Sequence, residues 1–269
     1  MRKELVVGSN KQEKNKRKAM LENLKIVFHN GKQFIPNVRT ATVPGIFRGR
    51  PIISGEKVNE TELIDLCPTD AISVNPVSID LGKCTFCGEC ALRFPEKITF
   101  TKDYKLATNI PDRLVIREGE DKPVEVDPEK VRKEIHRVLG RSLKLRQISA
   151  GGDNSCEMEL NAANNVMFDM SRFGIDFVAS PRHADGIVIT GPITVNMAEA
   201  VQICYDATPE PKIIVLVGTD AISGGLFAGS KAIDRSFLDK YPVDLYIPGN
   251  PAHPLTIVNG LLDLTRKLK

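Results

Sequence analysis

The spacing of four cysteines constrains this chain more than any other feature of its sequence. Cys84, Cys87 and Cys90 lie three residues apart, and Cys67 lies upstream, directly before a proline. The first 18 residues are polar and charged and lack the apolar stretch of a signal peptide, so we expect a cytoplasmic protein with reduced thiols. Clustered cysteines in that compartment are typical of metal sites. The sequence therefore predicts a metal site that takes three of its thiolates from one loop.

The same spacing is similar to part of the bacterial ferredoxin motif, C-x2-C-x2-C-x3-C-P, in which the fourth cysteine binds the other of two clusters. Cys67 and Pro68 resemble the end of a first copy of the motif, and residues 84–90 resemble the start of a second. The other ligand positions of the two copies hold no cysteine: Lys57, Glu60, Leu63 and Phe94. One cluster has thus lost every ligand, while the other keeps all four, which predicts a single [4Fe-4S] cluster bound by Cys67, Cys84, Cys87 and Cys90.

Zinc is the alternative occupant, because four cysteines also bind zinc tetrahedrally. Zinc sites usually pair their cysteines in two C-x2-4-C units, whereas here three ligands share one loop. The spacing therefore favours the iron–sulfur interpretation.

Residues 1–45 form a basic arm that contains an amphipathic segment. The first 50 residues hold twelve Lys or Arg against three Glu, although the whole chain has a net charge of only +3. Residues 14–30 open with cations and continue with apolar residues at helical spacing. Such a helix either packs on its own domain or lies on a membrane or partner surface. No nucleic-acid-binding motif is present, so we expect no nucleic-acid partner.

Beyond the cysteines, residues 46–106 are expected to form an α+β ferredoxin-like domain, and residues 107–142 a linker that includes strands at 114–117 and 124–126. A helix is predicted after Asp127, with the aspartate as its N-cap. From residue 143 to residue 269, short β-branched runs alternate with helical stretches. The runs lie at residues 143–149, 175–180, 186–190, 212–218 and 243–249, and the helical stretches at 156–171, 195–206, 231–240 and 253–268. This alternation predicts an α/β, doubly wound, flavodoxin-like domain with a parallel sheet.

Residues 20–105 resemble the ferredoxin-like iron–sulfur subunits of respiratory complex I and of group 4 membrane-bound nickel–iron hydrogenases, the formate hydrogenlyase type. The motifs that carry this resemblance are Phe47-Arg-Gly-Arg-Pro51, Cys67-Pro68, the second cysteine loop and Thr101-Lys-Asp-Tyr104. An amphipathic helix lies at the membrane interface in that family, which implies the same role for residues 14–30.

Residues 145–269 resemble the small, hydrogenase-type subunit of the same complexes, which holds a proximal cluster. The motifs that carry this second resemblance lie at residues 168–174, 180–186, 190–194, 209–212 and 248–251. The resemblance places the ligand positions of the proximal cluster at Asp153, Cys156, Asp220 and Asn250. Oxygen ligands suit iron–sulfur clusters poorly, so we expect the proximal cluster to be absent. Four polar residues each follow a predicted strand and should gather at the carboxyl edge of the sheet: Asp153, Thr190, Asp220 and Asn250.

Together the two resemblances imply an electron-transfer subunit of a membrane-associated, complex I-like or hydrogenase-related oxidoreductase. Its expected partners are a large catalytic-type subunit and membrane subunits, its expected location is the inner face of the cell membrane, and no catalysis is expected of this chain alone. Two alternatives stay open. In the first, the chain is a structural connector whose C-terminal domain carries no electrons. In the second, it is a stand-alone sensor that binds a ligand in the vacated cavity.

Overall fold

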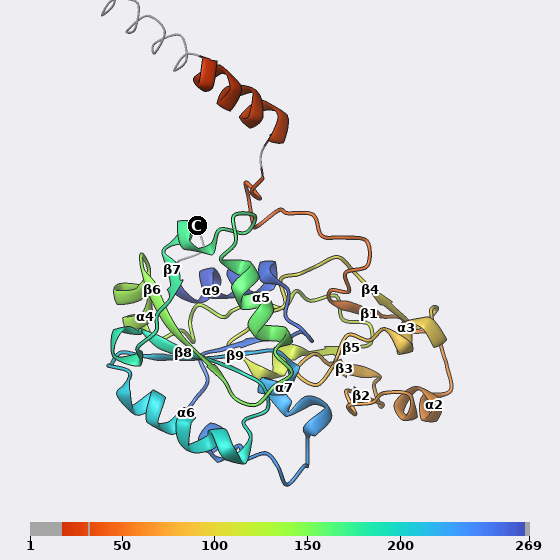
Figure 1. Ribbon diagram of the computed structural model, residues 1–269. Coiled ribbons are helices and arrows are strands. Elements are labelled where there is room, and N and C mark those ends of the chain that lie inside the picture. The colour runs from red at the N-terminus through yellow and green to blue at the C-terminus, as the bar shows by residue number, and fades with distance from the viewer. Residues whose placement is uncertain (1–17, 32, 267–269) are drawn as a thin grey trace, which may run out of the picture. The chain divides into compact units, whose positions relative to one another are not determined.

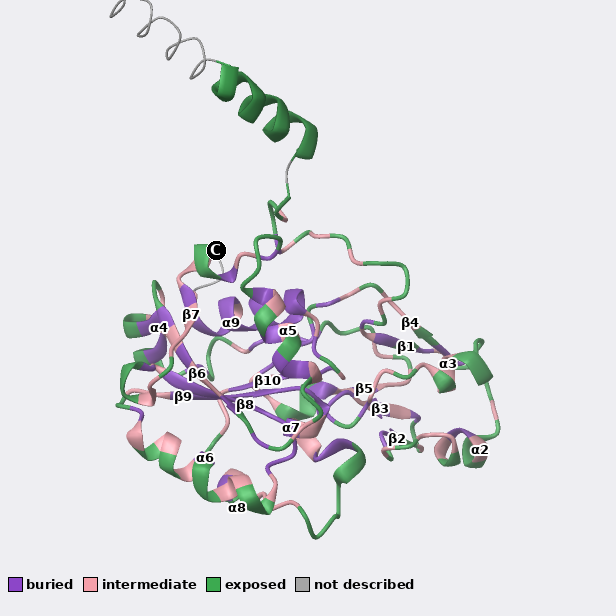
Figure 2. Ribbon diagram, viewed as in Figure 1, coloured by how far each residue is buried: buried purple, intermediate pink, exposed green. Residues whose placement is uncertain are grey.

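The structure is a computed structural model that describes residues 18–31 and 33–266. The chain divides into two compact units, Met1–Ile35 and Pro36–Lys269. In the first unit, residues 18–30 form a helix, and every residue of this helix is exposed (Figures 1 and 2). The cations predicted to precede it at Lys14, Lys16 and Arg17 lie outside the described residues. None of the helices in the described part of the chain has the length and apolar character needed to cross a membrane.

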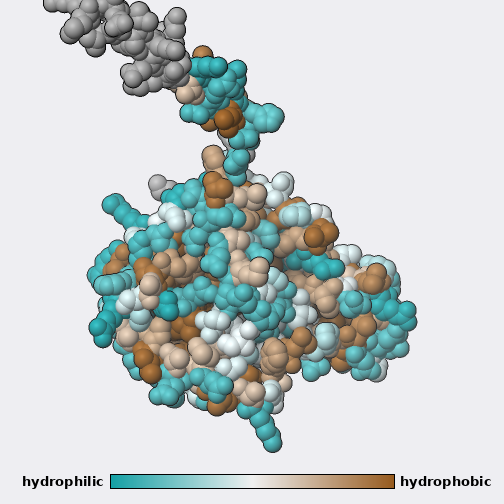
Figure 3. Space-filling model, in the orientation of Figure 1, coloured by the Kyte–Doolittle hydropathy of each residue, from teal (hydrophilic) through white to brown (hydrophobic). Residues whose placement is uncertain are grey.

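This helix carries a continuous apolar face. Its apolar side chains, which stand out beside polar ones in Figure 3, lie at the spacing of one helical face and are 43–83% exposed: Met20, Leu21, Leu24, Val27 and Phe28. Ile26 falls on the opposite face. The amphipathic helix expected from the sequence is therefore present over the residues that the structure describes.

The second unit begins with a β-α-β order that occurs twice. The elements of the first half are β1 (Pro51–Ile53), α2 (Glu60–Asp65) and β2 (Ile72–Ser73). Those of the second half are β3 (Ser78–Asp80), α3 (Glu89–Arg93) and β4 (Ile98–Phe100). Strand β1 pairs with β4, and β3 lies between β2 and β5 (Val115–Arg117), all antiparallel.

Two of the four ligand positions without cysteine are part of the protein core, whereas Lys57 and Glu60 are exposed. Leu63 is fully buried and Phe94 is 8% exposed, and both belong to the apolar cluster of this part. Lys97 is also buried, and its ammonium group lies 3.0 Å from the carboxylate of Glu118 and donates to the carbonyl oxygen of Glu56 at 2.7 Å. Apolar packing and a buried ion pair thus stabilise the side of the fold where no cluster ligands remain.

A five-stranded parallel sheet forms the larger part of the unit (Figure 1). Its strands lie where the sequence predicts them: β6 (Leu143–Ser149), β7 (Ile175–Phe177), β8 (Gly186–Thr190), β9 (Ile213–Val217) and β10 (Leu245–Ile247). Their order is β10-β9-β8-β6-β7, and every pair is parallel. Every residue of β8 and β9 is buried, as the continuous apolar runs require of strands covered on both faces (Figure 2).

Helices cover both faces of this sheet. On one face, α9 (Pro254–Thr265) contacts α5 (Ser155–Ala163) and α4 (Lys133–Leu139), and on the other, α6 (Val195–Ala207) contacts α8 (Ser236–Lys240) (Figure 1). The short helices α7 (Thr219–Ser223) and η4 (Gly225–Phe227) follow β9 and were not predicted.

Four predicted elements differ from the structure, two of them because a side chain forms a competing turn. The helix expected over 156–171 ends at residue 163, because the Asn165 side chain accepts hydrogen bonds from the amides of Met167 and Phe168 and forms a turn. The helix expected after Asp127 begins only at Lys133, because the Asp127 carboxylate caps a separate turn by accepting from the Glu129 amide. The strand expected at 124–126 is a buried loop, and the helix expected at 231–240 begins only at residue 236.

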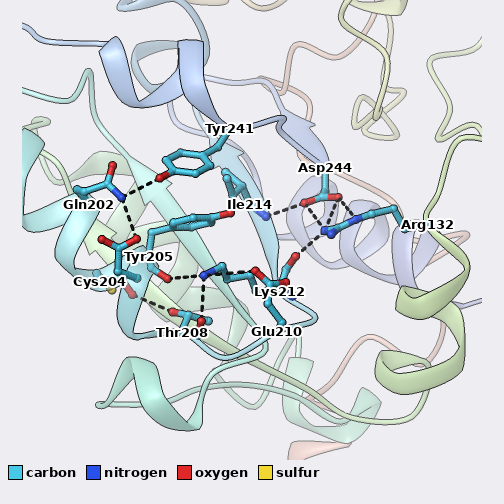
Figure 4. Close-up of polar contacts among 11 residues, drawn as sticks. Arg132, Gln202, Cys204, Tyr205, Thr208, Glu210, Lys212, Ile214, Tyr241 and Asp244 are labelled. Atoms are coloured by element: carbon cyan, nitrogen blue, oxygen red, sulfur yellow. Dashed lines mark hydrogen bonds and ion pairs between the residues drawn. The ribbon is translucent and has the colours of Figure 1, made fainter.

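Polar side chains close the amino edge of the sheet (Figure 4). The Asp244 carboxylate accepts from the Ile214 amide at 2.9 Å and from the Arg132 guanidinium at 2.9 Å, which attaches the end of the linker to the sheet. The Lys212 ammonium group donates to the carbonyl oxygens of Tyr205 and Thr208 and lies 3.9 Å from the centre of the Tyr205 ring. These contacts fix the loops opposite the edge where the predicted site residues gather.

The antiparallel and parallel parts share their packing. Thr108 and Tyr246 form an antiparallel bridge, with mutual amide–carbonyl hydrogen bonds of 3.0 and 2.8 Å. Ile222 and Tyr246 pack against the apolar cores of both parts. The two parts therefore belong to one compact unit.

Candidate iron–sulfur site

All four predicted cysteine ligands line one pocket. Cys67 follows α2, while Cys84, Cys87 and Cys90 lie on the loop between β3 and α3 and at the start of α3. Cys84 is buried, Cys67 and Cys90 are half-buried, and Cys87 is exposed. The rest of the lining is largely apolar and includes Leu66, Ala71, Ile72, Ile79 and Phe100. The structure thus brings together one cysteine from the first β-α-β half and three from the second.

The backbone of the cysteine loop turns through left-handed conformations on both sides of Cys87. Phe86 has φ 54° and Gly88 has φ 82°, and Gly88 is the N-cap of α3. Gly88 has a second constraint, because an added Cβ atom would lie 2.5 Å from the Nε atom of Arg48. A side chain at this position would therefore be strained by the backbone conformation and would displace the Arg48 side chain.

Backbone amides point at two of the sulfur atoms. The amide of Phe86 donates to Cys84 Sγ, and the amide of Ala71 donates to Cys67 Sγ, both at 3.3 Å. Such donors stabilise thiolates and tune the potential of a cluster that the thiolates hold.

Burial, together with the neighbouring thiols, raises the pKa of two of the four cysteines. Burial raises the pKa of Cys84 to about 12, and the neighbouring thiols Cys90, Cys67 and Cys87 add to the effect. Burial likewise raises the pKa of Cys90 to about 11, again with contributions from Cys87 and Cys67. Cys84 and Cys90 are therefore protonated at neutral pH unless a cationic centre binds them. Four sulfur donors in an apolar pocket with amide donors fit a [4Fe-4S] cluster, which would be held by these four cysteines and would supply one-electron chemistry. Within residues 18–31 and 33–266, no three or more His, Cys, Asp or Glu side chains, the four cysteines included, are grouped closely enough to hold a single metal ion. A four-iron cluster instead takes one thiolate on each of its irons.

The second predicted set gathers only in part. Cys156, at the start of α5, packs against Gly218, and its Sγ atom accepts a hydrogen bond from the Ala252 backbone. Burial raises the pKa of Cys156 to about 12, and the nearby carboxylates of Asp153 and Asp220 contribute. Cys156, Asp153 and Asp220 therefore lie near one another at the carboxyl edge of the sheet.

The oxygen-bearing members of this set already have other contacts. The Asp153 carboxylate accepts from the amide and the hydroxyl of Ser155 at 2.9 and 2.6 Å, and these bonds lower the pKa of Asp153. The Asp220 carboxylate packs against Gly225, and burial raises the pKa of Asp220. One thiol and two carboxylates in these contacts do not fit a second four-iron cluster.

Sequence reasoning missed Glu157, which is the buried carboxylate of this region. It is 6% exposed, and its Oε1 atom accepts from the Ser149 hydroxyl at 2.6 Å and the Thr190 hydroxyl at 2.7 Å. An acidic residue in the first turn of a helix ordinarily indicates an exposed side chain that favours the helix dipole. The sequence carries no signal that would distinguish this buried case.

Asn250, the fourth predicted position, lines a groove between the two parts. The groove also contains Arg48 and Phe86 from the cysteine-bearing part and His253 at the start of α9. The His253 ring packs edge-on against Phe47 at 5.2 Å between ring centres, and burial lowers the pKa of His253. Asn250 therefore faces the cysteine loop across this groove.

The other free thiol, Cys204, lies on α6 and packs partly buried against the apolar core of the parallel sheet. It belongs to neither predicted set, as the sequence indicates.

Comparison with known proteins identifies relatives of the C-terminal part. Residues 154–264 match the family described as NADH ubiquinone oxidoreductase, 20 Kd subunit. A probable membrane-bound hydrogenase subunit of Pyrococcus furiosus is 36% identical over 130 residues, which cover 48% of this chain and 78% of the relative. A subunit of the NADH-quinone oxidoreductase of Heliobacterium modesticaldum is 43% identical over 115 residues, which cover 42% of this chain and 66% of the relative.

Among solved structures, a chain of the membrane-bound sulfane sulfur reductase, an archaeal respiratory membrane complex, is 32% identical with a TM-score of 0.40. The alignment covers 45% of this chain and 67% of that chain. The family match includes Cys156, Asp220 and Asn250 but not the four cysteines of the loop site.

Proposed function

Because the chain belongs to the NADH ubiquinone oxidoreductase 20 Kd subunit family, we propose that it is the electron-transfer subunit of a membrane-associated, complex I-like or hydrogenase-related oxidoreductase. The named relatives are subunits of NADH-quinone oxidoreductase and of a membrane-bound hydrogenase. Reaction of the terminal substrate belongs to a separate, large catalytic-type subunit. This chain relays electrons and is not catalytic alone.

The observation that carries the proposal is the convergence of Cys67, Cys84, Cys87 and Cys90 on one largely apolar pocket. One [4Fe-4S] cluster bound there accepts and releases one electron at a time. In this proposal, the chain joins a ferredoxin-like part to a flavodoxin-like part that is similar to the hydrogenase small subunit.

The electron path of this subunit differs from that of relatives with a proximal cluster. The contacts of Asp153 and Asp220 favour a C-terminal part without its own cluster. If the loop cluster also failed to exchange electrons with partner subunits, the chain would be a structural connector. A reversible redox signal distinguishes the two functions.

The exposed apolar face of residues 18–30 supports a peripheral membrane contact. We place the subunit on the inner face of the cell membrane, with membrane subunits as partners.

The test is the iron and acid-labile sulfide content of the full chain, purified without oxygen, together with its electron paramagnetic resonance spectrum. We expect about four irons per chain and one signal on reduction. Cys87→Ala should abolish both, whereas Cys204→Ala removes a thiol outside the site and should change neither.

Other metal contents would overturn specific parts of the proposal. About eight irons per chain would show that the C-terminal part also holds a cluster. Zinc in place of iron would exclude electron transfer and leave the connector function.

A further inference from the structure

Arg48 packs against the outside of the loop that carries Cys87. Its Nη1 atom donates to the carbonyl oxygen of Phe86 at 3.1 Å. Its guanidinium also lies against Gly88, where an added Cβ would be 2.5 Å from Nε and 3.0 Å from Cζ. Phe86 and Gly88 are the two neighbours of Cys87, so one positive side chain contacts both residues that flank a cluster ligand.

Arg48 differs from the neighbouring Arg50 in its ion pairing. No carboxylate in the described part of the chain forms an ion pair with Arg48. Arg50, two residues further on, differs in this respect, because its guanidinium lies 2.6 Å from Asp121 and 3.7 Å from Asp103. Within the described residues, no carboxylate at ion-pair distance therefore offsets the field of Arg48 at the cysteine loop.

Arg48 also faces the C-terminal part. It lines the groove that contains Asn250 and His253, so it lies between the cysteine loop and the turn after β10. Gly49 follows it and has no space for a side chain, since an added Cβ would lie 2.1 Å from the carbonyl oxygen of Asp103. The backbone that presents Arg48 is thus fixed against the loop 101–104.

We propose that Arg48 is a positioning residue that holds residues 86–88 and raises the reduction potential of the cluster. This inference rests on the proposed function, because it requires a cluster at the four cysteines. Four thiolates make the bound cluster anionic, and reduction adds another negative charge. A nearby cation therefore stabilises the reduced form more than the oxidised form. Because Arg48 is exposed, water weakens this effect without abolishing it.

The test compares reduction potentials of full-chain variants, measured by redox titration of the resonance signal, with iron content determined on the same samples. Arg48→Gln removes the charge but keeps an N–H donor for the Phe86 carbonyl. We expect the equilibrium constant for reduction to fall by about threefold or more, which for one electron is about 30 mV. Arg48→Lys keeps the charge and should stay close to the wild-type potential. Arg113→Gln removes a surface cation paired with Asp127 at 3.4 Å and should leave the potential unchanged.

The reduction potential of Arg48→His at different pH values is a readout that a merely structural role of Arg48 would not change. Its potential should fall as pH rises through the ordinary imidazole pKa of about 6.5, more steeply than the wild-type potential does over the same range. If Arg48→Gln loses its iron, the pH dependence of the Arg48→His potential tests the inference in its place.

Two results would overturn the inference. One is an unchanged potential in Arg48→Gln, or in Arg48→His across the pH range. The other is an equal fall in Arg113→Gln, which would show an effect of net charge alone. Absence of iron from the wild-type chain would instead contradict the proposed function.

Discussion

The hydroxyl of Thr219 donates a hydrogen bond of 2.8 Å to the backbone carbonyl of Cys84. Thr219 is the first residue of α7 and is 1% exposed, and its hydroxyl also lies 3.3 Å from the carbonyl oxygen of Gly249. A buried contact thus connects the cysteine loop directly to the carboxyl edge of the parallel sheet. The edge of the sheet therefore helps to determine where Cys84 lies.

Thr219→Val should weaken both the fold and cluster retention. Valine has nearly the same shape but leaves the buried Cys84 carbonyl without its donor, which costs about 1–3 kcal/mol. Urea unfolding measures the loss of stability, and the iron content after gel filtration measures retention. Thr219→Ser keeps the hydroxyl and should retain iron like the wild type. Equal iron in the Val variant would show that the bond does not position the loop.

Thr190→Val should destabilise the protein by about 2 kcal/mol, because hydrogen bonds to charged groups contribute more than neutral ones. The buried Glu157 carboxylate would keep only the Ser149 hydroxyl as a side-chain donor. Thr190→Ser retains that donor and should lose less. The free energy of unfolding in urea checks the difference, and equal losses in the two variants would contradict the role of the hydroxyl.

Lys97→Met should cost about 3 kcal/mol, since it leaves Glu118 without its buried partner. The double variant Lys97→Met/Glu118→Gln removes the unpaired charge and should recover part of the loss. A double variant that is no more stable than Lys97→Met would show that the ion pair is not what stabilises this side of the fold. Chemical denaturation of the wild type, Lys97→Met, Glu118→Gln and the double variant gives the coupling free energy between Lys97 and Glu118.

His253 should make the fold sensitive to mild acid. Burial lowers its pKa in the folded state, so between that value and the ordinary 6.5 the unfolded chain binds more protons. Its contribution to stability is therefore complete above pH 6.5 and is lost as pH falls through that window. Protonation of Nδ1 would also remove the acceptor of the Leu255 amide at the start of α9.

The comparison is with His253→Asn, which keeps a capping acceptor but does not titrate. Between pH 7.5 and pH 5, the wild type should lose more of its free energy of unfolding than this variant. Identical losses would mean that His253 does not contribute to the pH dependence.

Phe28→Glu should weaken membrane association of the intact protein. Phe28 is 83% exposed on the apolar face of the helix at residues 18–30, and a carboxylate there opposes insertion among lipid tails. Sedimentation with vesicles of phosphatidylglycerol and phosphatidylethanolamine measures the effect. Ile26→Glu changes the opposite face and is the matched control, so an equal loss in both variants would indicate charge repulsion rather than a docking face.

The sequence predicts the regular elements of this chain well where burial is continuous. The apolar runs of β8 and β9 could be read directly, because a strand covered on both faces is apolar over most of its length, with Thr190 at the end of β8 as an exception. The early end of α5 could not be read, since it depends on a side-chain turn at Asn165 that competes with the helix. Asp127 has good capping chemistry, but the structure uses it for an isolated turn.

The cysteine site shows the same division. The spacing of the ferredoxin motif predicted Cys67 as the fourth ligand beside the three loop cysteines, and all four line one pocket in the structure. The contacts of Arg48 with residues 86–88 arise from tertiary packing between segments distant in the chain, for which the sequence has no local pattern. The burial of Glu157 depends in the same way on hydroxyls from two different strands.

The bridge between Thr108 and Tyr246 has a consequence for how electrons could leave the cysteine pocket. In complexes where a ferredoxin and its acceptor meet only on encounter, the gap between redox centres varies from one docking event to the next. Here the cysteine pocket and the parallel sheet belong to one compact unit. With the proposed cluster in the pocket, a partner bound to that sheet would meet it at one preset separation, and the rate of electron tunnelling would be a property of the folded chain rather than of a collision.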